Sequence, residues 1–174
     1  MSVFDDTLFD VLTQDLDDGL ILVDPCTHAL RWNPAALAMH GYAGTAPCPD
    51  SLESLAAAYD LCTVEGAHLS VDRRPLTQVL RGERIKDLEI LLRRKHDGWE
   101  RMLSYSGRLV GGSEGQAPTA VITVRDVTER KQSERTLREQ ETFLQLAYEA
   151  ADLGIVRNDL LTGDVIFDAR AQAH

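Results

Sequence analysis

Hydrophobic positions recur every four residues near the start of the chain and then change their spacing. The helical spacing of three leucines among aspartates predicts an amphipathic helix over residues 4–17, with its carboxylates facing water. Short apolar runs at residues 20–24 and 29–32 are typical of strands. The chain is therefore expected to begin with a helix followed by two strands. The three leucines are Leu8, Leu12 and Leu16.

Two short helices are marked by a proline in the first turn. Asn33 precedes Pro34, and an asparagine side chain at this position can accept a hydrogen bond from the free N–H groups of a helix start. Gly41 marks the end of this helix. Residues 75–80 predict a second helix of the same kind. Residues 43–70 mix signals for a short helix with signals for loops, and no single period dominates them.

The second half of the chain alternates with a period of two. Strands are predicted from Lys86 onward, over residues 102–110 and over residues 119–125. The first pair is separated by a turn at His96-Asp97-Gly98 and the second by a glycine-rich loop over residues 111–116. Because short connections join neighbouring strands as hairpins, the fold class expected is α+β with an antiparallel sheet.

The last predicted strand runs directly into a charged segment. Asp126 stands three residues before Glu129, which is the spacing of a capping box at a helix start, and Thr128 is a competing cap. A helix over residues 129–151 is expected to follow.

This helix carries charges of both signs, and Leu137 and Leu144 stand seven residues apart on it. The pattern is too short for a definite coiled coil. Two interpretations remain: a single solvated helix, or a parallel coiled-coil linker between two chains.

A segment near the C-terminus repeats the first two strands. Residues 19–33 align without gaps on residues 154–168, with Gly, Asp and Thr coinciding and an aromatic residue closing both copies. Residues 152–174 therefore resemble the start of a second domain like the first. Two strands cannot enclose a core, so this part is expected to be poorly ordered or to need a partner.

Composition and charge narrow the class of protein. The 174 residues are 44% hydrophobic and 26% charged, and no run of about 18 apolar residues occurs, so neither a membrane span nor a signal peptide is expected. A cytoplasmic location is the prediction. The net charge is −10, and seven aspartates precede the first basic residue, Arg31, so a nucleic-acid partner is not expected. The cysteines Cys26, Cys48 and Cys62 form no CxxC pair and predict free thiols without a metal site.

The sequence contains the short motifs Trp32-Asn33-Pro34-Ala35-Ala36, Gly41-Tyr42, Arg74-Pro75-Leu76, Asp97-Gly98 and Asp126-Val127-Thr128-Glu129-Arg130-Lys131. Together they resemble the PAS domains of bacterial signalling proteins, over roughly residues 15–131. The resemblance implies a five-stranded antiparallel sheet flanked by short helices, acting as a sensory or dimerisation module. Output domains in such proteins are histidine kinases, cyclic-dinucleotide enzymes or transcription regulators, and this sequence has no signature of any of them.

The resemblance also implies a domain organisation and a route for a signal. Asp126, Thr128 and Glu129 are expected to tie the last strand to the output helix. The leucines of the two outer helices, Leu8, Leu12, Leu16, Leu137 and Leu144, are expected to form a homodimer. The predicted parts are an N-terminal helix (1–18), a PAS domain (19–128), a helical linker (129–151) and the start of a second PAS-like domain (152–174).

A sensory pocket would lie between the sheet and the short helices. Haem needs an axial ligand, and His40 or His68 could supply one, although most histidines have other roles. Flavin photochemistry needs an Asn-Cys-Arg-Phe-Leu-Gln-like helix, which residues 60–64 do not match. No cofactor is therefore assigned, and a small-molecule ligand stays open. The candidate pocket residues are His40, Tyr42, Cys62, His68 and Tyr105.

The sequence shows no acid–base or nucleophile constellation and no phosphate-binding loop, so no enzyme activity is expected. The expected function is a sensory and dimerisation module that relays the state of its pocket or its dimer through the C-terminal helix. The alternative is a structural module that binds no ligand and only pairs two chains.

Overall fold

The computed structural model describes residues 6–42, 48–111, 117–150, 156–158 and 165–167. The chain divides into two units, residues 1–128 and residues 129–174.

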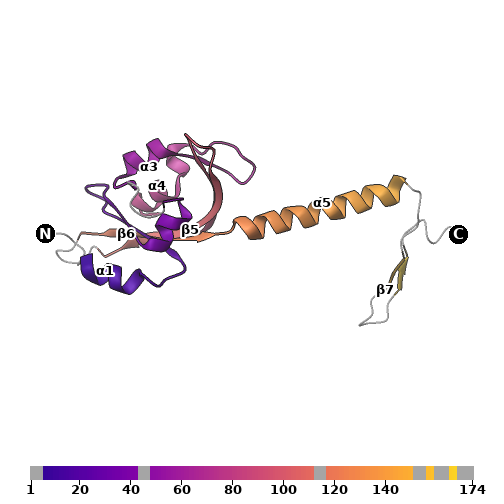
Figure 1. Cartoon of the computed structure of the whole chain (residues 1–174), viewed down its shortest axis with the longest axis horizontal. Coiled ribbons are helices and arrows are strands. Elements are labelled where there is room, and N and C mark those ends of the chain that lie inside the picture. The colour runs from indigo at the N-terminus through magenta and orange to yellow at the C-terminus, as the bar shows by residue number, and fades with distance from the viewer. Residues whose placement is uncertain (1–5, 43–47, 112–116, 151–155, 159–164, 168–174) are drawn as a thin grey trace. The chain divides into compact units, whose positions relative to one another are not determined.

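The first unit alternates short helices and strands before three long strands complete it (Figure 1). In chain order its elements are α1 (Asp6–Thr13), β1 (Gly19–Val23), β2 (Leu30–Trp32), α2 (Pro34–Met39), α3 (Leu52–Ala58), β3 (Tyr59–Cys62), the 3-10 turn η1 (Val71–Arg73), α4 (Pro75–Leu80), β4 (Ile85–Arg94), β5 (Glu100–Val110) and β6 (Thr119–Asp126).

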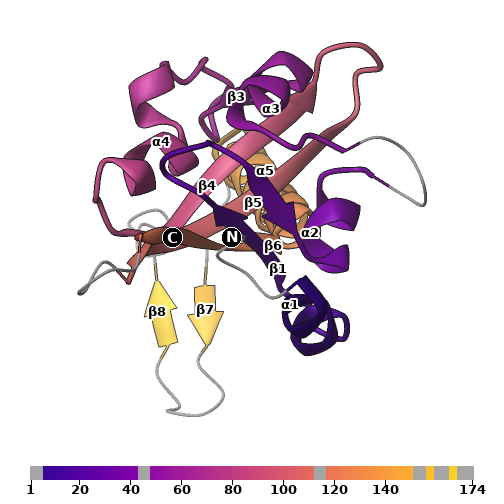
Figure 2. The same ribbon diagram turned by 90° about the vertical axis from the view of Figure 1, so that its left-hand side faces the viewer.

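The strands form one curled sheet in the order β2-β1-β6-β5-β4-β3, and every neighbouring pair is antiparallel (Figure 2). The α+β prediction with an antiparallel sheet is thus confirmed. The sheet has six strands where the resemblance implied five. The additional strand, β3, lies inside residues 43–70, where the sequence has no clear period.

The core lies between one face of this sheet and the helices. Helix α2 packs on β1 and β6, and α4 packs on β4, β5 and β6. Along β6 the buried residues Ala120, Ile122 and Val124 alternate with more exposed neighbours, so one face of the strand is apolar. This alternation fixes which side of the sheet the helices cover.

Asn33 holds three parts of the domain together from a fully buried position. Its Oδ1 accepts hydrogen bonds from the N–H of Ala36 at 2.9 Å, which caps α2, and from the N–H of Leu20 at 2.7 Å. Its Nδ2 donates to the carbonyls of Thr13 and Asp18. The cap predicted from the sequence is present, and the same side chain also fixes the segment between α1 and β1.

Two glycines allow the helices to approach the sheet closely. A Cβ on Gly19 would come within 2.9 Å of the Cα of Ala36 in α2. A Cβ on Gly107 in β5 would come within 2.9 Å of the Val121 carbonyl and 3.2 Å of the Val79 side chain in α4. Any larger residue at these positions would separate helix from strand.

The second unit consists of a helix and a short strand pair. Helix α5 (Thr128–Ala150) begins at the last residue of the first unit, and β7 (Val156–Asn158) pairs antiparallel with β8 (Val165–Phe167). The predicted repeat covers residues 152–174, most of which lie outside the described residues. The assignment of this part to a second domain therefore stays a prediction.

Candidate functional site

His40 follows the last turn of α2, and its side chain is enclosed by protein. Its Nδ1 lies 2.7 Å from the carbonyl oxygen of Ala36, and its Nε2 lies 2.9 Å from the phenolic oxygen of Tyr105. Because a carbonyl can only accept, Nδ1 carries the proton and Nε2 accepts from the tyrosine hydroxyl. Burial lowers the pKa of His40 to about 4, against a smaller opposite effect of the bond to Ala36, so the imidazole is neutral at pH 7.

Two tyrosines hold this histidine from different strands. Tyr105 in β5 donates to the ring, and Tyr59 in β3 donates to the backbone carbonyl of His40. Burial raises the pKa of both phenols, and a hydrogen bond with Tyr42 adds to the rise at Tyr59. Both hydroxyls therefore stay protonated and act as donors.

Aromatic rings enclose the same point edge-on. The His40 ring centroid lies 4.8 Å from that of Trp32, 6.2 Å from that of Tyr59 and 6.1 Å from that of Tyr105, and Tyr42 lies 6.3 Å from Tyr59. We call Trp32, His40, Tyr42, Tyr59 and Tyr105 the His40 cluster. Its members lie on β2, β3, β5 and the segment that follows α2. A displacement of one ring in the cluster would therefore act on several elements of the domain.

Arg94 braces one side of the His40 cluster. Its Nη2 donates to the carbonyl of Gly41 at 3.0 Å, and its guanidinium lies 4.9 Å from the ring centroid of Trp99 and 5.7 Å from that of Tyr42. Its Nε is buried without a hydrogen-bond partner among the described residues. The end of α2 is thereby pinned to the hairpin between β4 and β5.

The structure brings together three of the five predicted pocket residues. His40, Tyr42 and Tyr105 belong to the His40 cluster, whereas Cys62 and His68 do not. Cys62 is buried in β3, but side chains alternate along a strand, so it points away from the face that carries Tyr59. His68 is exposed and forms only a backbone bridge with Cys62.

Sequence reasoning missed Tyr59 and Trp99. Tyr59 lies in the segment without a clear period, where the alternation of β3 is only four residues long. Trp99 directly follows the predicted turn at Gly98. A hairpin turn at this position brings the residue after it beside the end of β4, and this was the one signal in the sequence that could have located Trp99.

The junction between β6 and α5 is fixed to β5 by hydrogen bonds on both sides of Met102. The Met102 N–H donates to the Thr128 hydroxyl at 3.0 Å, and the Met102 carbonyl accepts from the Val127 N–H at 2.9 Å. The Thr128 hydroxyl also lies 3.4 Å from the same carbonyl. The side chain of Thr128 thus continues the sheet pairing one step beyond the end of β6.

Asp126 completes this junction. One carboxylate oxygen accepts from the Thr128 N–H at 2.9 Å, and the other lies 3.0 Å from Nη1 of Arg101. The predicted capping box would have placed this bond at the N–H of Glu129 in a helix beginning at Val127, but α5 begins one residue later, at Thr128. Asp126 therefore caps the first N–H of the helix, and Glu129 is an exposed residue of its first turn.

Comparisons with known proteins show what this arrangement resembles. No protein-family model matches the sequence, and no curated protein sequence matches it. A sensory box histidine kinase/response regulator from Burkholderia thailandensis E264 is similar in structure, with a TM-score of 0.50 and 22% identity, covering 79% of this chain and 97% of that chain. The PAS domain of nitrogen regulation protein NR(II) from Vibrio parahaemolyticus has a TM-score of 0.45 and 18% identity, covering 68% and 97%. The first unit has the PAS fold.

A third similar structure is an RNA-binding light-oxygen-voltage receptor, with a TM-score of 0.51 and 16% identity. The match covers 82% of this chain but only 38% of the receptor. At such identities the likeness defines the fold of the first unit and leaves its ligand and activity open.

The leucines predicted to form a homodimer lie exposed. Phe9 and Thr13 face the domain, where Arg31 lies over the Phe9 ring at 4.4 Å and Thr13 is buried. Leu8 and Leu12 of α1 therefore point outward, 55% and 65% exposed. The predicted helix over residues 4–17 ends at Thr13, so Leu16 follows α1, and it is 47% exposed. Helix α5 likewise exposes Leu137 and Leu144, at 57% and 52%.

Among the residues that the structure describes, no group of His, Cys, Asp or Glu is suited to hold a metal ion. Among those same residues, no helix has the length and apolar character needed to cross a membrane. Both nitrogens of His40 are engaged in hydrogen bonds and His68 is exposed, so neither histidine fits an axial haem ligand in this conformation. The three cysteines are free thiols.

Proposed function

We propose that the PAS domain is the sensory part of a signalling protein and that it passes its state through α5 to an output domain outside this chain. The observation that supports this is an arrangement on one strand. Strand β5 carries Tyr105, which holds His40, and Met102, which holds Thr128 at the start of α5. The two residues are three positions apart, or about 10 Å along the strand.

This arrangement gives a mechanical route. A ligand or a proton that displaces the Tyr105 hydroxyl shifts β5, and Met102 transfers the shift to the backbone that begins α5. The hydroxyl of Thr128 and the carboxylate of Asp126 act as the fixed points, because they bind the strand and the helix start at once. The relay residues proposed are Asp126, Thr128 and, in the first turn of the helix, Glu129.

A fusion of residues 1–150 to a histidine-kinase core, with α5 continuous into the kinase helix, tests the relay. Tyr105→Phe is the internal disturbance and autophosphorylation rate is the output. We expect Tyr105→Phe to change the rate, and to lose most of its effect when Thr128→Val or Asp126→Ala is also present. Thr128→Ser keeps the hydroxyl and should preserve the effect. An effect of Tyr105→Phe that is equally large in all these backgrounds would reject the relay.

The second candidate is a structural module that binds no ligand and only pairs two chains. It is favoured by the His40 cluster, whose own side chains occupy the centre of the interior, and by the exposed apolar stripes of α1 and α5. Native mass spectrometry separates the two candidates. A copurified small molecule favours sensing, whereas a dimer without ligand favours the structural module.

Homodimerisation is part of both candidates and is proposed to use the exposed leucines. Leu12→Asp places a charge among the exposed leucines of α1, and Leu144→Asp does the same on α5. Gln132→Asp, on an exposed position of α5, is the matched control. Conversion of a dimer to a monomer by either leucine variant, but not by Gln132→Asp, would locate the interface.

A further inference from the structure

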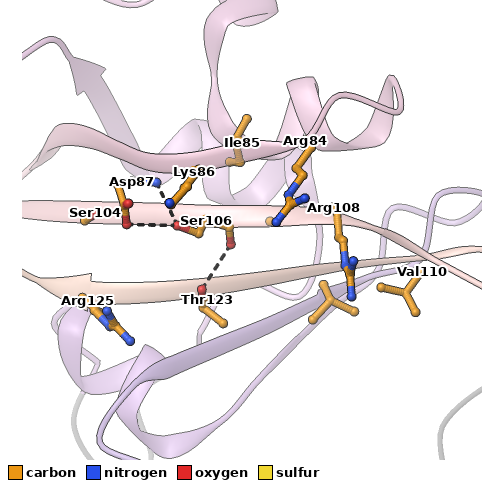
Figure 3. A pocket seen from close by; sticks show the side chains of 12 residues that line it. Arg84, Ile85, Lys86, Asp87, Ser104, Ser106, Arg108, Val110, Thr123 and Arg125 are labelled. Atoms are coloured by element: carbon orange, nitrogen blue, oxygen red, sulfur yellow. Dashed lines mark hydrogen bonds between the residues drawn. The ribbon is translucent and has the colours of Figure 1, made fainter.

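An open groove of about 410 Å³ runs along β4, β5 and β6 on the outer face of the sheet (Figure 3). On β6 it is lined by Val121, Thr123 and Arg125, which alternate with the buried residues of that strand. The groove therefore lies on the face of the sheet opposite the core. It is separate from the His40 cluster and from the junction with α5.

The groove is positively charged in a chain of net charge −10. Its lining includes the cations Arg84, Lys86, Arg108 and Arg125 and a single carboxylate, Asp87. Six arginines of the domain are paired with carboxylates, whereas no ion pair among the described residues includes Arg84, Lys86 or Arg108. The paired arginines are Arg31, Arg81, Arg93, Arg94, Arg101 and Arg125.

The single acid of the groove is already engaged. Asp87 sits at an irregularity between Ile85 and Leu88 in the pairing of β4 with β5, and its φ of 49° is left-handed. Its N–H donates to the Ser106 hydroxyl at 2.8 Å, and the same hydroxyl lies 3.4 Å from its carboxylate. Asp87 therefore stabilises the irregularity in the strand pairing through Ser106. The side chains of Arg84, Lys86 and Arg108 remain exposed to solvent.

A carboxylate already occupies one end of the same face. Asp18, from the segment after α1, binds Arg125 in a two-pronged arrangement, with Nε at 2.9 Å from Oδ1 and Nη2 at 2.8 Å from Oδ2. Figure 3 shows Arg84 and Arg108 at the other end, away from Arg125. Arg125 thus already binds a carboxylate on this face, and Arg84, Lys86 and Arg108 can bind further carboxylates in the same way.

We propose that this groove binds an acidic peptide segment of a partner protein, whose aspartate or glutamate side chains pair with Arg84, Lys86 and Arg108. The groove is too long and open for a single phosphate, since its cations spread over several residues of three strands. Its lining contains no aromatic side chain on which a nucleic-acid base could stack.

Fluorescence anisotropy with a labelled peptide of alternating glutamate and serine, added to the 174-residue chain at low salt, tests the proposal. Exposed ion pairs each contribute little, so the double variant Arg84→Gln/Arg108→Gln should raise the Kd about fivefold and Lys86→Gln about twofold. The matched control Arg73→Gln/Arg138→Gln removes the same charge outside the groove and should leave the Kd about unchanged.

Three results would overturn the proposal. An equal rise in Kd for the control variant would mean that binding reflects overall charge. Complete displacement of the peptide by inorganic phosphate, at matched ionic strength, would mean that the groove takes an adventitious ion only. Tighter binding of a labelled oligouridine than of the peptide would assign the groove to nucleic acid.

Discussion

The phenolic oxygen of Tyr105 lies 2.9 Å from Nε2 of His40, and both side chains are buried, so water cannot replace this hydrogen bond. Tyr105→Phe removes the donor and leaves the imidazole nitrogen unpaired. We expect a loss of about 1–3 kcal/mol in the free energy of unfolding, measured by urea denaturation. Tyr148→Phe, on α5 at 40% exposure, is the matched control and should cost less than about 0.5 kcal/mol. Equal losses in both variants would contradict the assigned role of the bond.

Acid should destabilise the domain through His40. Its pKa is about 4 in the folded state and 6.5 when unperturbed, so between these values the unfolded chain binds a proton that the folded chain excludes. Stability therefore falls as the pH drops below 6.5. We expect a loss of about 2 kcal/mol between pH 7 and pH 5, from the 1.36 kcal/mol that corresponds to one pKa unit.

Urea denaturation across this pH range, for the original chain and for His40→Gln, measures the effect. The variant lacks the titrating group and should show a much flatter dependence, whatever its absolute stability. The carboxyl pKa values of Asp18 and Asp24 are lowered by their hydrogen bonds, so their contribution to stability is lost only at lower pH. The same slope in both proteins would show that other groups cause the acid sensitivity.

Thr128→Val should loosen the junction between sheet and helix. The substitution keeps the shape of the side chain but removes the acceptor of the Met102 N–H. In the valine variant the Met102 N–H has lost this acceptor, so local opening costs less free energy. Amide hydrogen exchange at Met102 should therefore become faster by about tenfold. Thr128→Ser keeps the hydroxyl and should leave exchange at Met102 near its original rate. Slow exchange in the valine variant would mean that another group protects this amide.

Asn33→Ala should be among the most destabilising single substitutions in this domain. It removes the cap of α2 and leaves the N–H of Leu20 and the carbonyls of Thr13 and Asp18 without their side-chain partner. The expected loss is about 3 kcal/mol, read from thermal or urea unfolding. Asn33→Ser keeps a capping oxygen and should lose less. A loss below about 1 kcal/mol for the alanine variant would contradict the linking role of Asn33.

Much of the fold was predictable because its signals are local. Asn33 followed by Pro34 predicts the start of α2. The alternation of apolar and polar residues along β4, β5 and β6 predicts which face of each strand is buried. The sixth strand was not predictable in the same way. Strand β3 is four residues long, and its pairing with β4 is a long-range contact that leaves little trace in its own sequence.

The candidate site was predicted in part for the same reason. His40, Tyr42 and Tyr105 were predicted as pocket residues, but Tyr59, which contacts His40 and Tyr42, is brought beside them only by the pairing of β3 with β4. At the junction, residue spacing indicated Asp126 and Thr128 as alternative caps of the helix, and in the structure the Thr128 N–H donates to Asp126. It could not reveal that the bond partner of Thr128 is the backbone of Met102, 26 positions away.

The position of β1 next to β6 in the sheet has a mechanical consequence. Gly19, where the chain enters β1, pairs with Val124, close to where the chain leaves β6. Entry and exit thus lie at the same end of one antiparallel pair. Tension applied between them would peel the two strands apart one hydrogen bond at a time, rather than shear all the bonds at once. A force sensor built on this domain would therefore yield at low load, starting from the end that carries Asp126 and Thr128.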